Sequence, residues 1–452
     1  IIPTDILSRD AAIEMSFKPR PAYYARCREL NLPAPKEFYD PKIRNLFPWL
    51  ARRSRAVATA LNLAALLPAD MERSAFLEAL GFSRGKLMEL VKRGYPPLIS
   101  YSNPSPPLFI REKIIMDPMA GGGSIPLESV ILGARTIACE YNPVAFLILR
   151  ATIEWPAKFG YDLYAEVCKH AVEMIRFARD ALAPFYKDKD LGYVFVRCVK
   201  EDNEVIPLVS PVSLTRDVVV YITESRLELA KGKIRGKTRR DLLPLWMEQH
   251  VRLLKGDYDL MPVHKLIAVQ TQGGFRLPNE SDEILLYDAL VEYLKLNGAI
   301  MDIPLPSDNR VFEHILPLLN YRYLFNPRQG LAFIKLSTFL KHRISRILES
   351  DTEFGSAVAT YLAFGLCRLV DFNSILTSWN HYQGTVRGSL GSYYKFREFR
   401  LDGAYAEAVV PFRTLDWIFE PNADSKTAGG ICPILRELVR QLEKCDSNQI
   451  EI

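Results

Sequence analysis

The sequence predicts an α/β fold organised around a strand, a glycine loop and a helix. Ile114–Met116 is a short apolar run typical of a buried strand, and it ends in Asp117-Pro118. Gly121–Gly123 follow, and glycine permits backbone angles and close ligand approach that a Cβ would prevent. A second apolar run, Thr136–Cys139, ends in the acid Glu140. A glycine loop and an acid about 20 residues apart are typical of the nucleotide-binding end of a Rossmann-like sheet, where the acid binds ribose hydroxyls.

The residues after the loop predict a short helix. Ser124 is expected to be its N-cap, Pro126 suits a first helical turn, and Gly133 is placed to end it. The alternative for the whole stretch is a tight glycine turn in an ordinary β–α–β unit.

The composition of the loop favours S-adenosylmethionine as the cofactor. A dinucleotide site uses G-x-G-x-x-G and turns a helix N-terminus towards a pyrophosphate. Here the glycines are contiguous and follow Asp117-Pro-Met-Ala120. An acid at the mouth of the loop suits the sulfonium and ammonium groups of S-adenosylmethionine better than it suits a diphosphate.

Four sets of segments resemble the large prokaryotic adenine-specific DNA methylases, whose loop reads D-P-F-A-G-G-G-S. They are amino-methyltransferases with an N-terminal domain of unknown function. The matching segments are Leu46–Arg53 with Ala64–Pro68; Asp117–Ser124 with Glu140–Val144 and Ala151–Phe159; Leu324–Gln329; and Cys367–Asn373 with Trp379. The resemblance covers most of the chain from about Asn45. It implies a class I methyltransferase sheet, S-adenosylmethionine as cofactor and DNA as partner, with adenine N6 as the methylated position.

The resemblance also implies roles for individual residues. The amides of Gly121–Gly123 would meet the methionine carboxylate, Asp117 the ammonium group, and Glu140 both ribose hydroxyls. Tyr141 and Asn142 would flank the adenine. The expected cofactor-binding residues are Phe47, Trp49, Arg52, Asp117, Pro118, Met119, Ala120, Gly121, Gly122, Gly123, Ser124, Glu140, Tyr141 and Asn142. Phe47, Trp49 and Arg52 would lie near the methionine end; the alternative for Arg52 is an ion pair with a carboxylate under the sheet.

The catalytic residues cannot be assigned from this sequence. Amino-methylation needs a D/N-P-P-Y/F loop to hold the amine of an extruded base, and the chain contains none. In the resembled family the loop comes after the region that matches Trp417–Lys444. We therefore expect the cofactor-binding part of a split enzyme, with the loop on a second methyltransferase subunit in a heterodimer or higher heteromer. The alternatives are a sequence lacking its remainder, an inactive DNA-binding or regulatory module, and an RNA methyltransferase.

Composition indicates a soluble globular protein of two or three domains. The 452 residues are 48% hydrophobic and 25% charged. No apolar run approaches the roughly 18 residues of a membrane span, and no signal peptide is recognisable. Seven scattered cysteines without a C-x-x-C pair indicate reduced thiols and a cytoplasmic location. A net charge of +5 permits a DNA partner without demonstrating one.

We expect four consecutive segments. They are an N-terminal arm with a helical part (1–100), the cofactor-binding α/β core (101–187), a β-rich insert (188–280) and a helical region (281–452). Helices are expected over residues 45–67, 71–93, 161–186, 283–296, 328–348, 356–371 and 431–444, and strands within 193–196, 217–222 and 260–277. Cys198 stands alone where the resembled family often carries zinc-ribbon cysteine pairs, so we expect no metal site.

Two stretches are candidates for contact with nucleic acid. The first has six cations in ten residues, which suits a mobile hairpin near phosphates. The second is polar and aromatic, which suits stacking on unpaired bases. The candidate residues are Lys231, Lys233, Arg235, Lys237, Arg239 and Arg240 in the first, and Trp379, His381, Tyr382 and Arg387 in the second. The alternatives are a solvated hairpin tip and a surface loop pinned by its aromatic residues.

Overall fold

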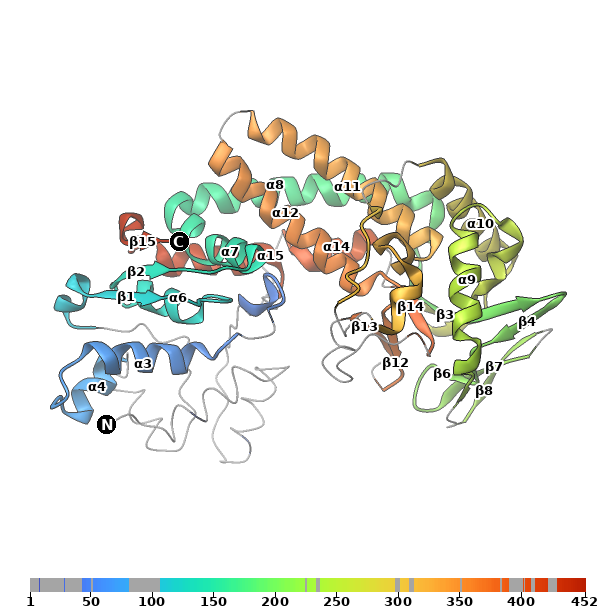
Figure 1. The fold of residues 1–452 in the computed structure, drawn as a ribbon, viewed down its shortest axis with the longest axis horizontal. Coiled ribbons are helices and arrows are strands. Elements are labelled where there is room, and N and C mark those ends of the chain that lie inside the picture. Colours follow the sequence, from blue (N-terminus) through green and yellow to red (C-terminus); the bar gives the residue numbers. More distant parts are fainter. Residues whose placement is uncertain are drawn as a thin grey trace. The chain divides into compact units, whose positions relative to one another are not determined.

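The computed structural model has a mixed α/β fold with eleven α-helices and several sheets among its described residues (Figure 1). These are residues 43–49, 52–80, 106–223, 226–232, 236–296, 301–308, 313–349, 352–382, 384–389, 401, 403–407, 411–421 and 429–452, together with 8 and 28. The predicted α/β class is confirmed. Most of the expected N-terminal arm, and the candidate residues Lys233 and Arg235, lie outside the described residues.

The chain divides into two compact units that are not consecutive in sequence. The first contains residues 1–170, 346–364 and 419–452, and the second contains 171–345 and 365–418. This division differs from the four expected segments, because the last part of the chain returns twice to the first unit.

The first unit contains a three-stranded parallel sheet. Its strands are β1 (Ile114–Asp117), β2 (Arg135–Ala138) and β15 (Ile450–Glu451), in the order β1-β2-β15. Helix α6 (Ser124–Ile131) connects β1 to β2, and Gly133 follows it at φ +88°, in the position expected for a terminating glycine. The described strands are too few to establish a full Rossmann-like sheet.

Two N-terminal helices pack beside α6. They are α3 (Arg55–Leu66) and α4 (Arg73–Ala79), and α3 ends before Pro68 as predicted. Their apolar core includes Leu63, Phe76 and Leu132. Asn62 of α3 donates to the carbonyl of Ile125 at 3.1 Å and to the Ser129 hydroxyl at 2.9 Å. These bonds fix α3 along the helix that follows the glycine loop.

A long helical stretch follows the sheet. It consists of α7 (Pro143–Leu149), a π-helical turn (Arg150–Glu154) and α8 (Trp155–Leu182), which has a non-helical residue at Gly160. Helix α15 (Ile431–Leu442) precedes β15, and α12 (Thr352–Phe372) contributes to both units. By length and composition α12 could cross a membrane, but 61% of its apolar window is buried inside the structure. Core helices of soluble proteins have the same character.

Strands of the second unit curl into a half-barrel. The largest sheet has the order β11 (Gly274–Arg276), β10 (His264–Thr271), β3 (Asp190–Glu201) and β14 (Tyr405–Glu407), and β4 (Glu204–Pro207) also pairs with β3. A second sheet comprises β6 (Val212–Ser213), β7 (Val218–Ile222) and β8 (Leu227–Lys231), and β5 (Val209–Ser210) pairs with β9 (Lys237–Thr238). Both larger sheets contribute to one apolar core. The strands from β3 to β11 fall where the β insert was expected.

Helices and one hairpin complete the second unit. The helices are α9 (Leu243–Leu253), α10 (Glu280–Lys295), α11 (Pro327–Leu348) and α14 (Pro411–Phe419), and the hairpin pairs β12 (Ser378–Asn380) with β13 (Thr385–Arg387). Asn326 caps α11 as predicted, because its side-chain oxygen accepts the amide of Gln329 at 2.8 Å.

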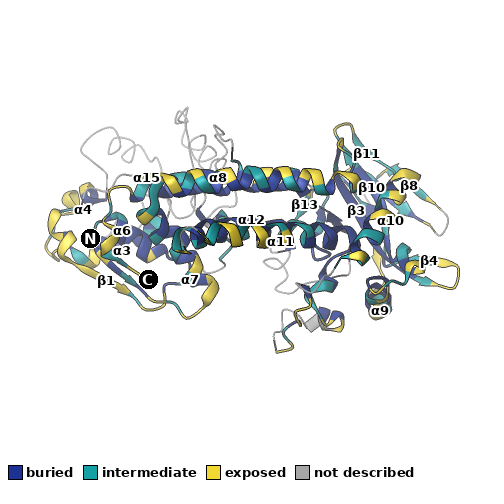
Figure 2. Ribbon diagram, turned by 90° about the horizontal axis from the view of Figure 1, so that it is seen from above, coloured by how far each residue is buried: buried dark blue, intermediate teal, exposed yellow. Residues whose placement is uncertain are grey.

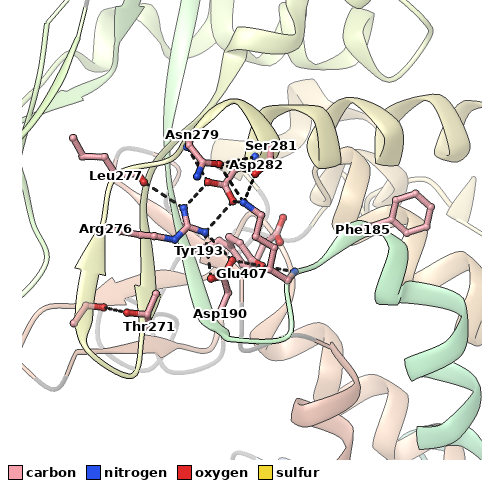
Figure 3. Close-up of polar contacts among 12 residues, drawn as sticks. Phe185, Asp190, Tyr193, Thr271, Arg276, Leu277, Asn279, Ser281, Asp282 and Glu407 are labelled. Carbon is pink, nitrogen blue, oxygen red and sulfur yellow. Dashed lines mark hydrogen bonds and ion pairs between the residues drawn. The ribbon is translucent and has the colours of Figure 1, made fainter.

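A polar network joins β3, β11 and α10 (Figure 3). Arg276 donates to Asp190 at 3.0 Å and to Asp282 at 2.5 Å, and Lys187 reaches Asp282 at 2.6 Å. Burial alone would raise the pKa of Asp282, but the hydrogen bonds from Arg276 and Lys187 outweigh it and lower the pKa to about 2. The carboxylate therefore stays ionised and holds the start of α10 against the sheet.

A second buried chain of polar groups runs through the core of this unit. His250 Nε2 donates to the carbonyl of Tyr323 at 2.9 Å, and its Nδ1 accepts His264 Nε2 at 2.8 Å. The Tyr405 hydroxyl donates to His264 Nδ1 at 2.8 Å. Burial lowers the pKa of His250 to about 4 and holds the pKa of His264 well below its usual value. Both rings are therefore neutral at pH 7.

Candidate functional site

The glycine loop is tied to the carboxyl end of the neighbouring strand β2. The amide of Cys139 donates to the carbonyl of Asp117 at 2.9 Å, and the amide of Ala120 donates back to the carbonyl of Cys139 at 3.0 Å. Because these bonds continue the parallel ladder beyond β1, they bring the residues that follow β2 next to the loop. Glu140 is the second of these residues.

Glu140 links the loop to the start of α7. Its Oε2 accepts the amide of Gly121 at 2.7 Å, and its Oε1 accepts the amide of Asn142 at 2.8 Å. These amides lower the pKa of Glu140, with the Asn142 amide contributing most. The carboxylate is thus ionised and oriented by the backbone.

Asp117 and the residues beside it lie at the mouth of the loop. Asp117 Oδ1 accepts the amide of Met119 at 3.2 Å, and its other oxygen makes no hydrogen bond to a described residue. Met119 and Tyr141 are exposed. The side chain of Asn142 caps α7 by accepting the amides of Val144 and Ala145, so its expected place beside an adenine competes with a structural role.

The predicted N-cap of α6 is wrong by one residue. Gly123, at φ +81°, is the N-cap, and Ser124 is the first helical residue. The Ser124 hydroxyl accepts the amide of Arg53 at 3.2 Å and donates to the carbonyl of Arg53 at 3.0 Å. It is therefore used to hold the N-terminal segment on the helix.

Side chains of this chain lie against all three loop glycines. A Cβ on Gly121 would be 3.2 Å from Trp49 Nε1, and a Cβ on Gly122 would be 2.8 Å from both Trp49 Cδ1 and Arg52 Cγ. A Cβ on Gly123 would be 2.6 Å from Leu149 Cδ2. Side chains of the protein itself therefore occupy the space that the missing Cβ atoms leave beside these glycines. Trp49 and Arg52 lie at the loop.

Trp49 and Arg52 carry buried donors that have no acceptor. Trp49 Nε1, Arg52 Nε and Arg52 Nη2 make no hydrogen bond within the part of the chain that the structure describes. Burial, and then the neighbouring cation of Arg55, lower the pKa of Arg52 to about 10. Arg55 differs because it donates to Glu128. No described carboxylate pairs with Arg52, so the alternative of an ion pair under the sheet is not observed.

Other parts of the first unit support the loop from behind. Leu149 and Ile153, on either side of the start of the π-helical turn, face Gly123. The hydroxyl of Tyr361 donates to the carbonyl of Ala151 within that turn. The sequence analysis did not identify Leu149 or Tyr361, because no local pattern signals a π-helical turn. Phe47 packs on Phe364, with ring centroids 4.7 Å apart.

The candidate nucleic-acid residues that are described belong to the second unit. Lys231, Lys237, Arg239 and Arg240 are exposed. Trp379 is a core residue whose Nε1 donates to the carbonyl of Leu214 at 2.8 Å, so the structure corrects its expected role as a base-stacking side chain. The rings of His381 and Tyr382 are in tilted contact between β12 and β13, with centroids 4.1 Å apart, and Arg387 lies partly buried in β13.

Within the described residues, no cluster of three or more histidine, cysteine or acidic side chains is arranged to hold a metal ion. No protein-family model, curated protein or solved structure matches the chain.

Proposed function

We propose that the chain is the cofactor-binding part of an S-adenosylmethionine-dependent DNA amino-methyltransferase acting on adenine N6. The observation that carries this proposal is the set of buried donors of Trp49 and Arg52, which lie against the glycine loop and have no acceptor among the described residues. Leaving such donors without an acceptor costs about 1–3 kcal/mol each, so a ligand that supplies acceptors there would be strongly favoured.

The donors suit a carboxylate. Arg52 Nε and Nη2 lie on one edge of the guanidinium group, which is the edge that binds a carboxylate with two parallel hydrogen bonds. Trp49 Nε1 adds a third donor next to Gly121. The methionine end of S-adenosylmethionine carries such a carboxylate, and its ammonium group would meet the unbonded oxygen of Asp117. Glu140, oriented by two amides, would accept the ribose hydroxyls.

Each of these residues would position the cofactor rather than react. S-adenosylmethionine supplies an electrophilic methyl group that a base amine displaces directly. Holding the adenosyl end at Glu140 and the amino-acid end at Arg52 and Asp117 leaves the sulfonium between two anchored points. Such positioning removes the entropic part of the barrier for the transfer.

We also propose that a second subunit supplies the catalytic loop to this site. Strand β1 lies at one end of the sheet, with no second neighbour among the described strands. Ile114 and Met116 are exposed. Exposed and intermediate residues alternate along β1 (Figure 2). Parallel sheets are normally covered on both faces and paired on both sides of their central strands. A partner that adds a strand beside β1 would bring its loop to the end of the sheet that holds Asp117.

Calorimetric titration of two ligands tests the proposal. S-adenosylmethionine has the amino-acid group, and 5′-methylthioadenosine lacks it. Arg52→Ala is expected to weaken S-adenosylmethionine at least tenfold and leave 5′-methylthioadenosine unchanged, whereas Glu140→Ala should weaken both. Arg53→Ala, an adjacent exposed arginine whose contacts to Ser124 are through its backbone, is the matched control.

Two results would overturn this function. One is no binding of either ligand, and the other is equal binding by all variants; both favour an inactive regulatory or DNA-binding module. Competition between duplex DNA and structured RNA at fixed salt then separates a DNA enzyme from an RNA methyltransferase.

A further inference from the structure

A groove of about 710 Å³ lies on the surface of the second unit. Strands β4, β5, β7 and β9 contribute to its walls. The lining residues are Glu204, Ile206, Pro207, Ser210, Ile222, Thr223, Lys237 and Arg239. The groove belongs wholly to the second unit and takes no residue from the glycine loop.

The walls of the groove are held by short-range bonds. The Ser210 hydroxyl donates to the carbonyl of Ile222 at 3.1 Å and accepts its amide at 3.3 Å, which links β5 to the end of β7. A Cβ on Gly236 would lie 2.2 Å from the carbonyl oxygen of Pro211, so only glycine lets the chain enter β9 so close to β5. These contacts fix the strand that carries Lys237.

The chemistry of the lining is cationic with an apolar part. Lys237 and Arg239 are exposed, and no carboxylate among the described residues pairs with either. Ile206, Pro207 and Ile222 supply apolar surface between the strands. Glu204 is the single acid among the described residues of the lining. Cations next to apolar surface suit a polyanion with flat, weakly polar groups.

An exposed aromatic residue of the β12–β13 hairpin lies near the other end of β7. Arg216, just before β7, lies 5.9 Å from the ring centroid of Tyr382, and the rings of Tyr382 and His381 are in tilted contact. About seven residues of extended chain, roughly 23 Å, separate Arg216 from Thr223 at the groove. An aromatic side chain and a cationic groove near opposite ends of β7 are the two components with which proteins bind single strands of nucleic acid.

We propose that this groove binds the sugar–phosphate backbone of nucleic acid, with Lys237 and Arg239 on phosphates and Tyr382 against a base. The inference rests on the proposed function for the substrate and adds where that substrate lies on the second unit. It also separates Lys237 and Arg239 from Lys231 and Arg240, the other described basic residues of the stretch, because only the first two line the groove.

Salt-dependent binding of a fluorescent single-stranded DNA tests the groove. Removing two cations that contact phosphates is expected to reduce the magnitude of the slope of log K against log salt concentration by about 1.4, at about 0.7 for each contact. Lys237→Ala/Arg239→Ala should show this change and bind at least tenfold more weakly at low salt. Lys189→Ala/Lys255→Ala, which removes two exposed cations elsewhere in the same unit, should keep the wild-type slope.

Two further variants sharpen the result. Glu204→Gln is expected to tighten binding, because it removes a negative charge from the wall, and Tyr382→Ala should weaken binding without changing the slope. An unchanged slope in the Lys237/Arg239 variant, or an equal change in the control, overturns the groove. Weaker binding after Glu204→Gln would also overturn it, since that sign indicates a cationic partner such as a basic peptide.

Cofactor affinity of the same variants reports separately on the proposed function, because none of these residues belongs to the loop.

Discussion

The carboxylate of Glu140 accepts the amide of Gly121 at 2.7 Å, across 19 residues of sequence. This bond joins the second residue after β2 to the first glycine after β1, and the amide of Asn142 holds the other carboxylate oxygen. The acid and the loop therefore form one structural unit. A substitution of Gly121 or Glu140 is therefore expected to alter the position of the other residue.

Glu140→Gln is expected to lower the affinity for S-adenosylmethionine about tenfold. The amide nitrogen of glutamine cannot accept a backbone hydrogen bond, so one of the two amide contacts is lost together with the charge. The thermal midpoint should change little, because Glu140 is partly exposed. Calorimetry and thermal unfolding measure the two quantities, and a large fall in the midpoint would show that the residue acts mainly in folding.

Gly123→Ala is expected to destabilise the protein more than Gly133→Ala. Both residues have positive φ, +81° and +88°, so each substitution carries a backbone penalty of about 1–2 kcal/mol. A Cβ at residue 123 would lie 2.6 Å from Leu149 Cδ2, whereas the nearest atom to a Cβ at residue 133 would be Arg111 Cγ, at an ordinary contact distance of 3.6 Å. The free energies of unfolding from urea titrations give the difference, and equal values would exclude close packing behind the loop.

Glu407→Gln is expected to destabilise the protein by about 3–5 kcal/mol, because it leaves the buried Arg328 without a counter-charge. Arg328 Nε donates to Glu407 at 2.9 Å, and both side chains are almost wholly buried. The control is Glu228→Gln, which breaks an exposed pair with Arg226 and should cost about 0–1 kcal/mol. Urea titration of both variants checks this, and similar losses would contradict the role of burial.

Stability is expected to fall as the pH decreases from about 6.5 towards 4. His250 has a pKa of about 4 in the folded protein and an ordinary value near 6.5 when unfolded, so in this range the unfolded chain binds more protons. The loss is about 1.4 kcal/mol per pH unit for one group. Urea titrations at several pH values should show this slope, and His264→Gln should reduce it, while His342→Gln, on α11, should not. An unchanged slope in His264→Gln would place the pH dependence elsewhere.

Local patterns in the sequence determined the elements around the loop. The apolar runs ending in Asp117 and Glu140 predicted β1 and β2, and Gly133 marked the end of α6, because strand endings and helix caps depend on neighbouring residues. Asn326 predicted the start of α11 for the same reason. Ser124 shows the limit of this reasoning, because a distant segment uses its hydroxyl.

Only the tertiary structure decided which distant residues meet. It placed Trp49 and Arg52 on Gly121 and Gly122, with donors that find no acceptor in the described part of the chain, where the resemblance alone suggested their neighbourhood. Strand β15 joined β2 from more than 300 residues away, and Tyr405 completed a polar chain with His264. No spacing rule links such positions, because their contacts depend on how whole elements pack. The residue types of the loop were therefore readable in the sequence, while the unpaired donors that suggest its ligand appeared only in the folded chain.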